Sequence, residues 1–261
     1  MRAVAVNPDT RHLPSAGAVH LWLCRADYAT GNEALRARYK ALLSSDELKL
    51  CERIRNARQQ HSALLTRVLV RTVLSQYASI EPEAWRFAAD ARHKPCIANP
   101  RSTMRFNLSH SRDWIVCAVG AGFELGVDVE YCHPDRDVLR LAKRFFSPEE
   151  FASLRLLSAQ QRITRFYDYW TLKESWLKAT GLGISGGLDS VVFDLQEGGD
   201  MTFSTPAGHT KYHFNNWQLD SSYRLALCYE CLNKHAVPVT IYQTEPLTNS
   251  WVKTLPTNTQ Q

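Results

Sequence analysis

The sequence lacks any long apolar run. No stretch of the 261 residues approaches the roughly 20 apolar residues that a membrane-spanning helix needs. Residues 1–17 are polar and contain proline, without the apolar core of a secretory leader. These absences argue against a membrane protein and predict a cytoplasmic location. A disulfide framework is also absent, because the seven cysteines are an odd number scattered singly through apolar stretches, as reduced, buried thiols are.

No polybasic run is present either. The chain carries 31 Lys and Arg against 26 Asp and Glu, a net charge of +5. An excess of this size favours an acidic partner, whether nucleic acid, an anionic cofactor or an acidic protein. The basic residues gather only moderately, in 53–71 and 136–144. This dispersal predicts several separate anion contacts and argues against a nucleic-acid groove.

The remaining composition is that of an ordinary globular protein, with 44% hydrophobic and 22% charged residues. Apolar periodicity predicts helices and an antiparallel meander in each of two portions of the chain. We therefore predict an α+β protein of two similar halves, 1–123 and 124–245, each an antiparallel sheet packed with helices. Residues 237–244 are expected to form an edge strand, and 246–261 a polar, flexible tail.

The stretch Gly126-Val127-Asp128-Val129-Glu130 predicts a buried strand that carries two carboxylates on one face. Strand side chains alternate, so Val127 and Val129 face one side while Asp128 and Glu130 face the other. Two carboxylates at the edge of a hydrophobic sheet repel each other and need a positive charge nearby. Oxygen ligands with room for water and phosphate suit Mg²⁺. The alternative is an exposed edge strand whose carboxylates face water.

The strongest predicted helix runs from about Gln160 to Thr180 and is ended by Gly181. Glu174 lies on the flank of its aromatic face, and Lys178 follows one turn later. One interpretation is a surface Glu–Lys pair, worth about 0.3 to 0.5 kcal/mol. The other is a third carboxylate at a buried helix edge, which shares a cation with the D-x-E strand.

Two further helices carry charged residues that each allow two interpretations. The helix expected over 59–77 places Arg67 and Arg71 on one face, as a solvated surface or as a phosphate clamp. Ser147 begins another helix as its N-cap, with Glu150 three residues on, which is the spacing of a capping box. Capping explains Glu150 without any catalytic role, and both interpretations stay open.

Polar residues are also predicted on consecutive loops at one edge of the first sheet. Lys94 precedes Pro95, whose fixed φ holds the lysine in a defined direction. Ser109 and His110 follow at the end of a predicted strand. A histidine there is either bonded to the backbone at the edge of the core or directed at a ligand.

Several motifs occur in a fixed order between residues 51 and 228. They are Lys94-Pro95-Cys96-Ile97, Phe106-Asn107-Leu108-Ser109-His110-Ser111, Gly126-Val127-Asp128-Val129-Glu130, Lys143-Arg144-Phe145-Phe146-Ser147 and Trp170-Thr171-Leu172-Lys173-Glu174-Ser175-Trp176-Leu177-Lys178. In this order they resemble the phosphopantetheinyl transferases of the surfactin-synthetase-activating (Sfp) type. The most specific part is D-x-E followed at this separation by W-x-x-K-E-x-x-x-K.

The resemblance implies a pseudo-twofold fold with coenzyme A and Mg²⁺ in the cleft between the halves. The reaction implied is transfer of the 4′-phosphopantetheine arm from coenzyme A to a serine of an acyl or peptidyl carrier protein, with release of 3′,5′-ADP. By the same resemblance, Asp128, Glu130 and Glu174 match the metal ligands. Lys178 matches the lysine that assists at the phosphates, and Glu150 matches a candidate base for the serine proton.

Coenzyme A is expected to contact both halves. The residues assigned to it, by the resemblance or by their charge and position, are Lys94, Pro95, Ser109, His110, Lys173, Lys178, Arg67 and Arg71. His110 is also expected to assist catalysis by supplying charge or a donor at the phosphates. Glu47, Leu50 and Ser62 occupy places where the family has basic residues that hold the 3′-phosphate, so those contacts stay open.

Two alternatives to a transferase come from other classes of function. A Mg²⁺-dependent nuclease also uses acidic pairs followed by E-x-x-x-K, but the dispersed basic charge argues against it. A non-catalytic module that binds coenzyme A or a carrier protein would not need the carboxylates. For the transferase, we expect an acidic carrier protein docked on the helix over 136–144, no nucleic-acid or membrane partner, and a monomer.

Overall fold

The computed structural model is an α+β protein. It describes residues 4–5, 17–99, 102–183, 187–196, 200–205, 208, 211–231, 235–248, 251–254 and 257–258. The chain divides into two compact units. Unit 1 contains 1–122 and 237–255, and unit 2 contains 123–236 and 256–261. In the described part of the chain, every helix is too short or too polar to cross a bilayer.

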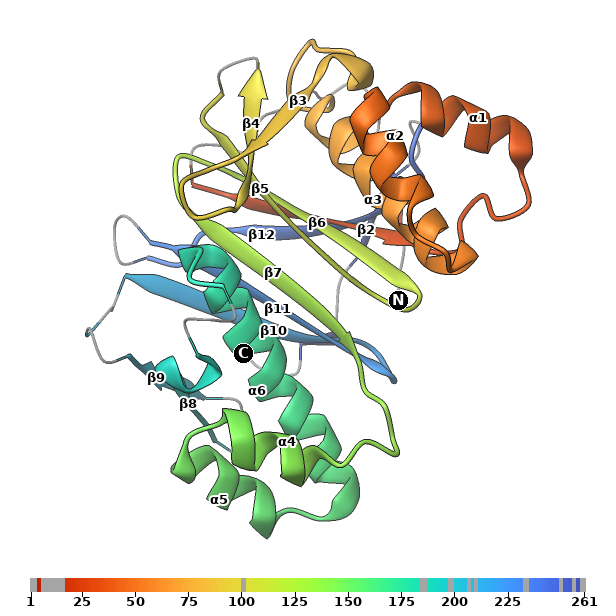
Figure 1. Ribbon diagram of the computed structural model, residues 1–261. Coiled ribbons are helices and arrows are strands. Elements are labelled where there is room, and N and C mark those ends of the chain that lie inside the picture. The colour runs from red at the N-terminus through yellow and green to blue at the C-terminus, as the bar shows by residue number, and fades with distance from the viewer. Residues whose placement is uncertain are drawn as a thin grey trace. The chain divides into compact units, whose positions relative to one another are not determined.

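Each unit combines helices with strands (Figure 1). The elements of unit 1 are β1 Val4–Ala5, β2 Val19–Arg25, α1 Glu33–Ala41, α2 Ser45–Glu52, α3 Ala57–Leu74, the 3₁₀ helix η1 Pro82–Ala84, β3 Arg86–Ala89, β4 Pro95–Asn99, β5 Met104–Ser111, β6 Trp114–Ala121, β12 Val239–Thr244 and β13 Trp251–Thr254. Those of unit 2 are β7 Leu125–Tyr131, α4 Val138–Phe145, α5 Pro148–Leu156, α6 Ala159–Thr180, the 3₁₀ helix η3 Leu188–Ser190, β8 Val192–Leu195, β9 Met201–Ser204, β10 Tyr212–Asp220, β11 Tyr223–Glu230 and β14 Thr257–Asn258.

The main sheet of unit 1 has the strand order β1-β13-β12-β2-β6-β5. Strands β2, β6 and β5 are antiparallel neighbours, as the predicted meander requires. Strand β12 pairs with β2 in parallel and with β13 on its other side. The prediction of an edge strand at 237–244 is therefore wrong, because both sides of β12 are paired within the sheet. Apolar side chains of α1 and α3 form one core with those of β2, β5 and β6.

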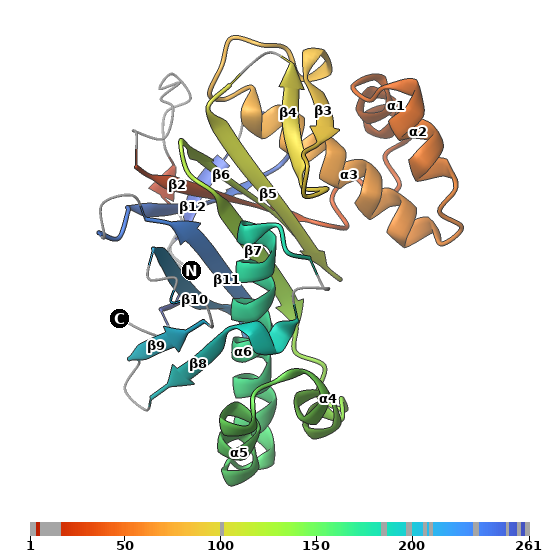
Figure 2. The same ribbon diagram turned by 60° about the vertical axis from the view of Figure 1, so that its left-hand side comes forward.

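The sheet of unit 2 has the order β14-β10-β11-β7, and its strands are antiparallel. Helix α6 lies along β7 and β11, as both ribbon views show (Figure 2). Its aromatic and aliphatic side chains form a core with α4, α5, β8 and the facing side chains of β10 and β11. The helix predicted over 160–180 is therefore the element on which unit 2 is assembled.

The end of the chain is more ordered than a flexible tail. Strand β13 pairs with β1 and β12, and β14 pairs with β10. Contacts group 237–255 with unit 1, whereas the sequence placed this segment in the second half and the tail. The local pattern identifies a polar segment, but it does not identify strand partners that lie far away in sequence. Residues 249–250, 255–256 and 259–261 of the expected tail lie outside the described residues.

Helix boundaries follow their capping residues. Helix α5 begins after Ser147, whose side chain accepts the Glu150 N–H while the Glu150 carboxylate accepts the Ser147 N–H, so the predicted capping box is confirmed. Helix α6 ends at Gly181, which takes the left-handed φ of +70° that glycine adopts without strain. These two helices position the charged residues of unit 2.

Candidate active site

Helix α6 lies directly against the carboxylate-bearing face of β7. A Cβ atom at Gly126 would stand 2.1 Å from the Ser175 carbonyl oxygen and 2.4 Å from the Ala179 nitrogen. Only glycine permits so close an approach of two backbones. Because strand side chains alternate, Asp128 faces the same side as Gly126. The glycine thus brings Asp128 next to the C-terminal half of α6.

Asp128 is engaged by a lysine from α6. The Lys178 ammonium lies 2.7 Å from Asp128 Oδ1 and also donates to the Val127 carbonyl oxygen at 3.1 Å. Asp128 is only 4% exposed. This burial excludes the alternative in which its carboxylate faces water. The predicted need for a nearby positive charge is met in this structure by Lys178.

Glu174, one turn before Lys178, is a half-buried carboxylate. Within the described residues it forms no hydrogen bond and no ion pair. Burial raises the pKa of Glu174, the charge of Asp128 raises it further, and the charge of Lys178 lowers it. The effect of the Asp128 charge on the pKa of Glu174 places a like charge in the surroundings of Glu174.

Glu130 is half-buried, two residues beyond Asp128 on the same strand. In the pairing of β7 with β11 it lies opposite Arg224, which forms an ion pair with Asp168 of α6 at 3.0 Å. Within the described residues, no group of three or more His, Cys, Asp or Glu side chains is close enough to hold a metal ion. The structure thus pairs Lys178 with Asp128, beside the half-buried Glu174.

Glu150 and Lys173 form an ion pair that the sequence did not predict. Glu150 Oε2 lies 2.8 Å from Lys173 Nζ, and both side chains are 0% exposed. Burial lowers the pKa of Lys173, although the Glu150 charge acts in the opposite direction. This geometry favours the capping role of Glu150. It does not favour Glu150 as the base or Lys173 as a coenzyme A contact, because both charged groups are enclosed.

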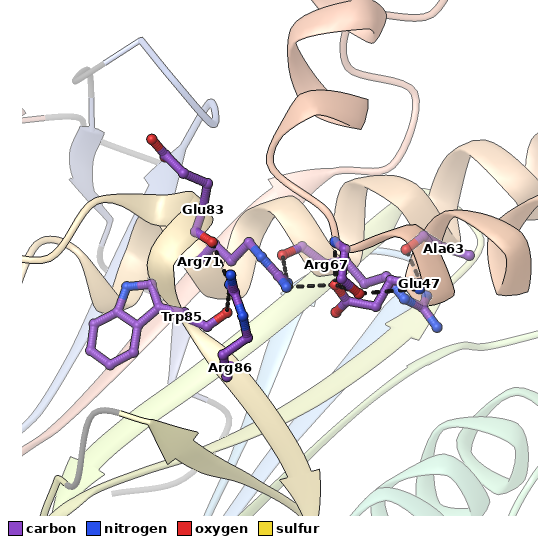
Figure 3. A network of polar contacts seen from close by, with 8 residues as sticks. Glu47, Ala63, Arg67, Arg71, Glu83, Trp85 and Arg86 are labelled. Carbon is purple, nitrogen blue, oxygen red and sulfur yellow. Dashed lines mark hydrogen bonds and ion pairs between the residues drawn. The ribbon is translucent and has the colours of Figure 1, made fainter.

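In unit 1, Arg71 points inward and is only 1% exposed. Its Nη2 lies 2.6 Å from Glu47 Oε2 (Figure 3). Its guanidinium carbon lies 4.9 Å from the centroid of the Phe87 ring. Arg67 is half-buried and donates to the Ala63 carbonyl oxygen at 3.0 Å. The two arginines therefore do not form a clamp on one solvated face. Arg71 is held by a carboxylate, and only Arg67 is partly exposed.

The remaining predicted residues of unit 1 lie on β4 and β5. Lys94 is buried immediately before β4, and Pro95 is the first residue of that strand. The Lys94 N–H donates to Asp90 Oδ1 at 2.9 Å, so its backbone is held by the preceding turn. Ser109 is buried and His110 is exposed near the end of β5. Ser109 and His110 lie near a strand end, as predicted, but within β5 and not on a loop. The predicted common edge of the first sheet is wrong for Lys94 and Pro95, because β4 pairs with β3 in a separate two-stranded sheet. Contacts of all four residues with coenzyme A stay predictions.

Comparisons with known proteins identify the family. A model of the 4′-phosphopantetheinyl transferase superfamily matches residues 124–228, and a model of the 4′-phosphopantetheinyl transferase N-terminal region matches residues 32–121. The chain belongs to the 4′-phosphopantetheinyl transferase family. It is an enzyme that transfers the phosphopantetheine arm of coenzyme A to carrier proteins. Membership in this family argues against the nuclease and the non-catalytic module.

Individual relatives support the assignment over most of the chain. A 4′-phosphopantetheinyl transferase of Bacillus subtilis is 34% identical over 192 residues, which is 73% of this chain and 84% of the relative. The 4′-phosphopantetheinyl transferase Sfp of Bacillus subtilis strain 168 is 32% identical over the same shares of both chains. The 4′-phosphopantetheinyl transferase HetI of a Nostoc species is 38% identical over 169 residues, 64% of this chain and 70% of the relative.

Sequence reasoning missed three features of the site. They are the backbone contact at Gly126, the enclosed Glu150–Lys173 pair and the Glu47–Arg71 pair. The contact at Gly126 could have been predicted from the sequence, because a glycine inside a predicted strand often marks a close approach of another backbone. The two ion pairs join residues far apart in sequence, and residue type alone does not predict such partners.

Proposed function

We propose that this transferase acts with Mg²⁺ held by Asp128, Glu130 and Glu174, and that it releases 3′,5′-ADP. The chemistry of the donors supports the proposal, since carboxylates offer the oxygen ligands that Mg²⁺ prefers. Within the described residues the three do not yet converge, so binding would need their side chains to turn toward the ion. The charge of Asp128 raises the pKa of Glu174, which supports a shared need for a cation. When bound, Mg²⁺ would neutralise charge on the diphosphate oxygens of coenzyme A.

Glu174 is the observation that carries this proposal. A half-buried carboxylate beside a second carboxylate destabilises the fold unless a cation compensates it. Lys178 is bound to Asp128 Oδ1 and to the Val127 carbonyl, so its ammonium is directed at the strand. Groups that cost stability in this way gather at functional sites. Within the described residues Glu174 has no ion-pair partner, and a bound cation would supply one.

Lys178 is proposed to stabilise the phosphates of coenzyme A during transfer. Its side chain is 28% exposed, and its ammonium forms an ion pair with the Asp128 carboxylate. A metal ion on Asp128 would take over the neutralisation of that carboxylate. Lys178 could then donate to a phosphate oxygen, where a fixed positive charge stabilises developing negative charge.

Contacts with the rest of coenzyme A are proposed for Lys94, Pro95, Ser109 and His110, with His110 directed at the phosphates. His110 is supported by its exposure, and Lys94 by the turn that holds its backbone. Arg67 is proposed as an anion contact because its side chain is partly exposed. Arg71 is left out of this proposal, since its guanidinium is buried against Glu47.

The partner is proposed to be an acidic acyl or peptidyl carrier protein. The net charge of +5 supports this, and so do the exposed Lys143 and Arg144 on α4, which follows β7 in the chain. Electrostatic complementarity of this kind speeds encounter more than it raises affinity. We also propose that the enzyme is a monomer in the cytoplasm.

Replacing Glu174 by Gln tests the metal site. Without the charge there is no repulsion with Asp128, so we expect an unchanged or higher melting temperature. The transfer rate should fall by about 100-fold or more. Mn²⁺ binding, followed by electron paramagnetic resonance without coenzyme A, should weaken. The matched control is Asp194→Asn, an exposed carboxylate on β8. Wild-type Mn²⁺ affinity and rate in the Glu174 variant would refute the site.

A further inference from the structure

The Glu150–Lys173 pair is sealed inside unit 2. The two side chains are 0% exposed, and the Lys173 ammonium lies 5.3 Å from the centroid of the Phe146 ring and 5.9 Å from that of Phe193. A serine on a folded carrier protein and the phosphates of coenzyme A both need an open path, because each is attached to a larger polar molecule. Neither group reaches this pair in the folded unit.

The hydrogen-bonding capacity of the pair is also taken up by the protein. Glu150 Oε2 accepts the Ser147 N–H at 2.9 Å together with Lys173, and Oε1 accepts the Phe193 N–H at 2.9 Å. The ammonium donates to the carbonyl oxygens of Leu188, at 2.8 Å, and Val191. All three ammonium protons thus have acceptors. A carboxylate bound in this way is a poor acceptor for a further proton from substrate.

These bonds join four separate elements of unit 2. Glu150 belongs to the first turn of α5, Lys173 to α6, Leu188 to η3, and Phe193 to β8. The residue after Lys173 is Glu174, and Lys178 follows on the same helix. Because Lys173 is anchored, the rotation of α6 about its own axis is fixed next to Glu174. This rotation sets the direction in which the Glu174 side chain projects from the helix.

We infer that Glu150 and Lys173 are positioning residues, which hold α6 so that Glu174 and Lys178 face the reacting groups. Neither Glu150 nor Lys173 touches coenzyme A or takes the serine proton. This inference rests on the proposed function for the roles of Glu174 and Lys178. The motif order alone suggests that Glu150 is the base and that Lys173 contacts coenzyme A. The inference gives both residues a positioning role instead. The serine proton then leaves through a group other than Glu150.

Removing the two charges separately and together tests the inference. Lys173→Met leaves a buried carboxylate unpaired, and Glu150→Gln leaves a buried ammonium unpaired, so each should lower the melting temperature by about 10 °C. The double variant removes both charges and keeps an amide oxygen for the backbone donors. It should recover at least half of that loss, and its kcat/KM should return to within about 10-fold of wild type.

A catalytic Glu150 gives a different pattern. Loss of a general base costs about 10² to 10⁴ in rate, and Lys173→Met does not restore it. Glu150→Gln and the double variant would then both be folded and equally inactive, and the acidic limb of the kcat/KM profile against pH would disappear. That result would overturn the inference. The control Glu149→Gln, at the neighbouring exposed carboxylate, should match wild type in rate and pH profile.

A second measurement uses the wild-type protein, so it does not depend on whether a variant folds. Brief acetic anhydride treatment of the wild type, read by peptide mass spectrometry, should leave Lys173 unmodified with or without coenzyme A. Exposed Lys143 should be acetylated in both samples. Acetylation of Lys173 that coenzyme A suppresses would overturn the inference. Mg²⁺-independent turnover by the wild type would contradict the proposed function alone, because the labelling and the recovery by the double variant do not depend on the metal.

Discussion

Arg71 is a cation enclosed in the core of unit 1. Its Nη2 is paired with Glu47, and its Nη1 donates to the Arg67 carbonyl oxygen at 3.3 Å (Figure 3). The Phe87 ring lies beside the guanidinium. A buried charge is tolerated when an opposite charge and hydrogen bonds replace water. The spacing of Arg67 and Arg71 predicts a shared helix face, but it does not tell which side chain turns inward. For this reason the phosphate clamp was a natural prediction from sequence and is not what the structure shows.

The Glu47–Arg71 pair predicts a pH dependence of stability. Burial acts to raise the pKa of Glu47, but hydrogen bonds from Ser44 and the charge of Arg71 lower it overall. A carboxyl whose pKa is lower in the folded protein stabilises the fold above its unfolded pKa of about 4.3, and this contribution is lost as the pH falls through the folded pKa.

We therefore expect Glu47→Gln to lower the free energy of unfolding by about 3 kcal/mol at pH 7, because it leaves Arg71 buried without a countercharge. The difference from wild type should shrink as the pH falls below about 4. Urea unfolding at several pH values measures it, with the exposed Asp46→Asn as control. A difference that stays constant between pH 7 and pH 3 would mean that the ion pair does not carry the effect.

At the scale of secondary-structure elements, the contact between α6 and β7 organises the site. The sequence predicted both elements, with their orientation toward the core, from periodicity and end signals. It also predicted that Asp128 and Glu174 are drawn together by a shared need for positive charge. It did not predict that Lys178 would supply that charge in the structure. The sequence pattern defines which face of an element is polar. The ion-pair partner of Asp128, in contrast, depends on how the side chains of β7 and α6 meet when the two elements pack.

Gly126→Ala tests this contact. The added methyl would lie 2.1 Å from a backbone oxygen of α6, and backbone atoms cannot rotate away. The helix must shift, so we expect a loss of about 1 to 3 kcal/mol in stability. The transfer rate should fall by about 10-fold or more, because small misplacements of catalytic groups are costly. Both are measured by urea unfolding and by carrier-modification kinetics.

The control for that variant is Gly122→Ala. Gly122 has a φ of +84° and open space around its Cβ position. Alanine there should reduce stability by about 1 kcal/mol through backbone strain alone and leave the transfer rate unchanged. If Gly126→Ala likewise lost stability but kept the full rate, the contact would not position the site.

For the whole molecule, the sequence was most informative through the order of its motifs. Motifs are local, so Asp128, Glu130, Glu174 and Lys178 can be named as candidates without knowledge of the fold. Strand order is not local. Strand β12 pairs in parallel with β2, from the opposite end of the chain, and no periodicity in either strand encodes that pairing. The polar C-terminal segment also pairs with strands far away in sequence, so its local pattern predicts a flexible tail where the structure has strands.

The central claim is that Mg²⁺ is required for transfer of phosphopantetheine to a carrier serine. The most direct measurement is the intact mass of an acidic apo carrier protein after incubation with this enzyme and coenzyme A, with 3′,5′-ADP followed by chromatography. In Mg²⁺ the carrier should gain one phosphopantetheine per 3′,5′-ADP released. Chelation should stop the reaction and added Mg²⁺ should restore it. An unchanged carrier mass on several carriers, or undiminished transfer in excess chelator, would contradict the claim.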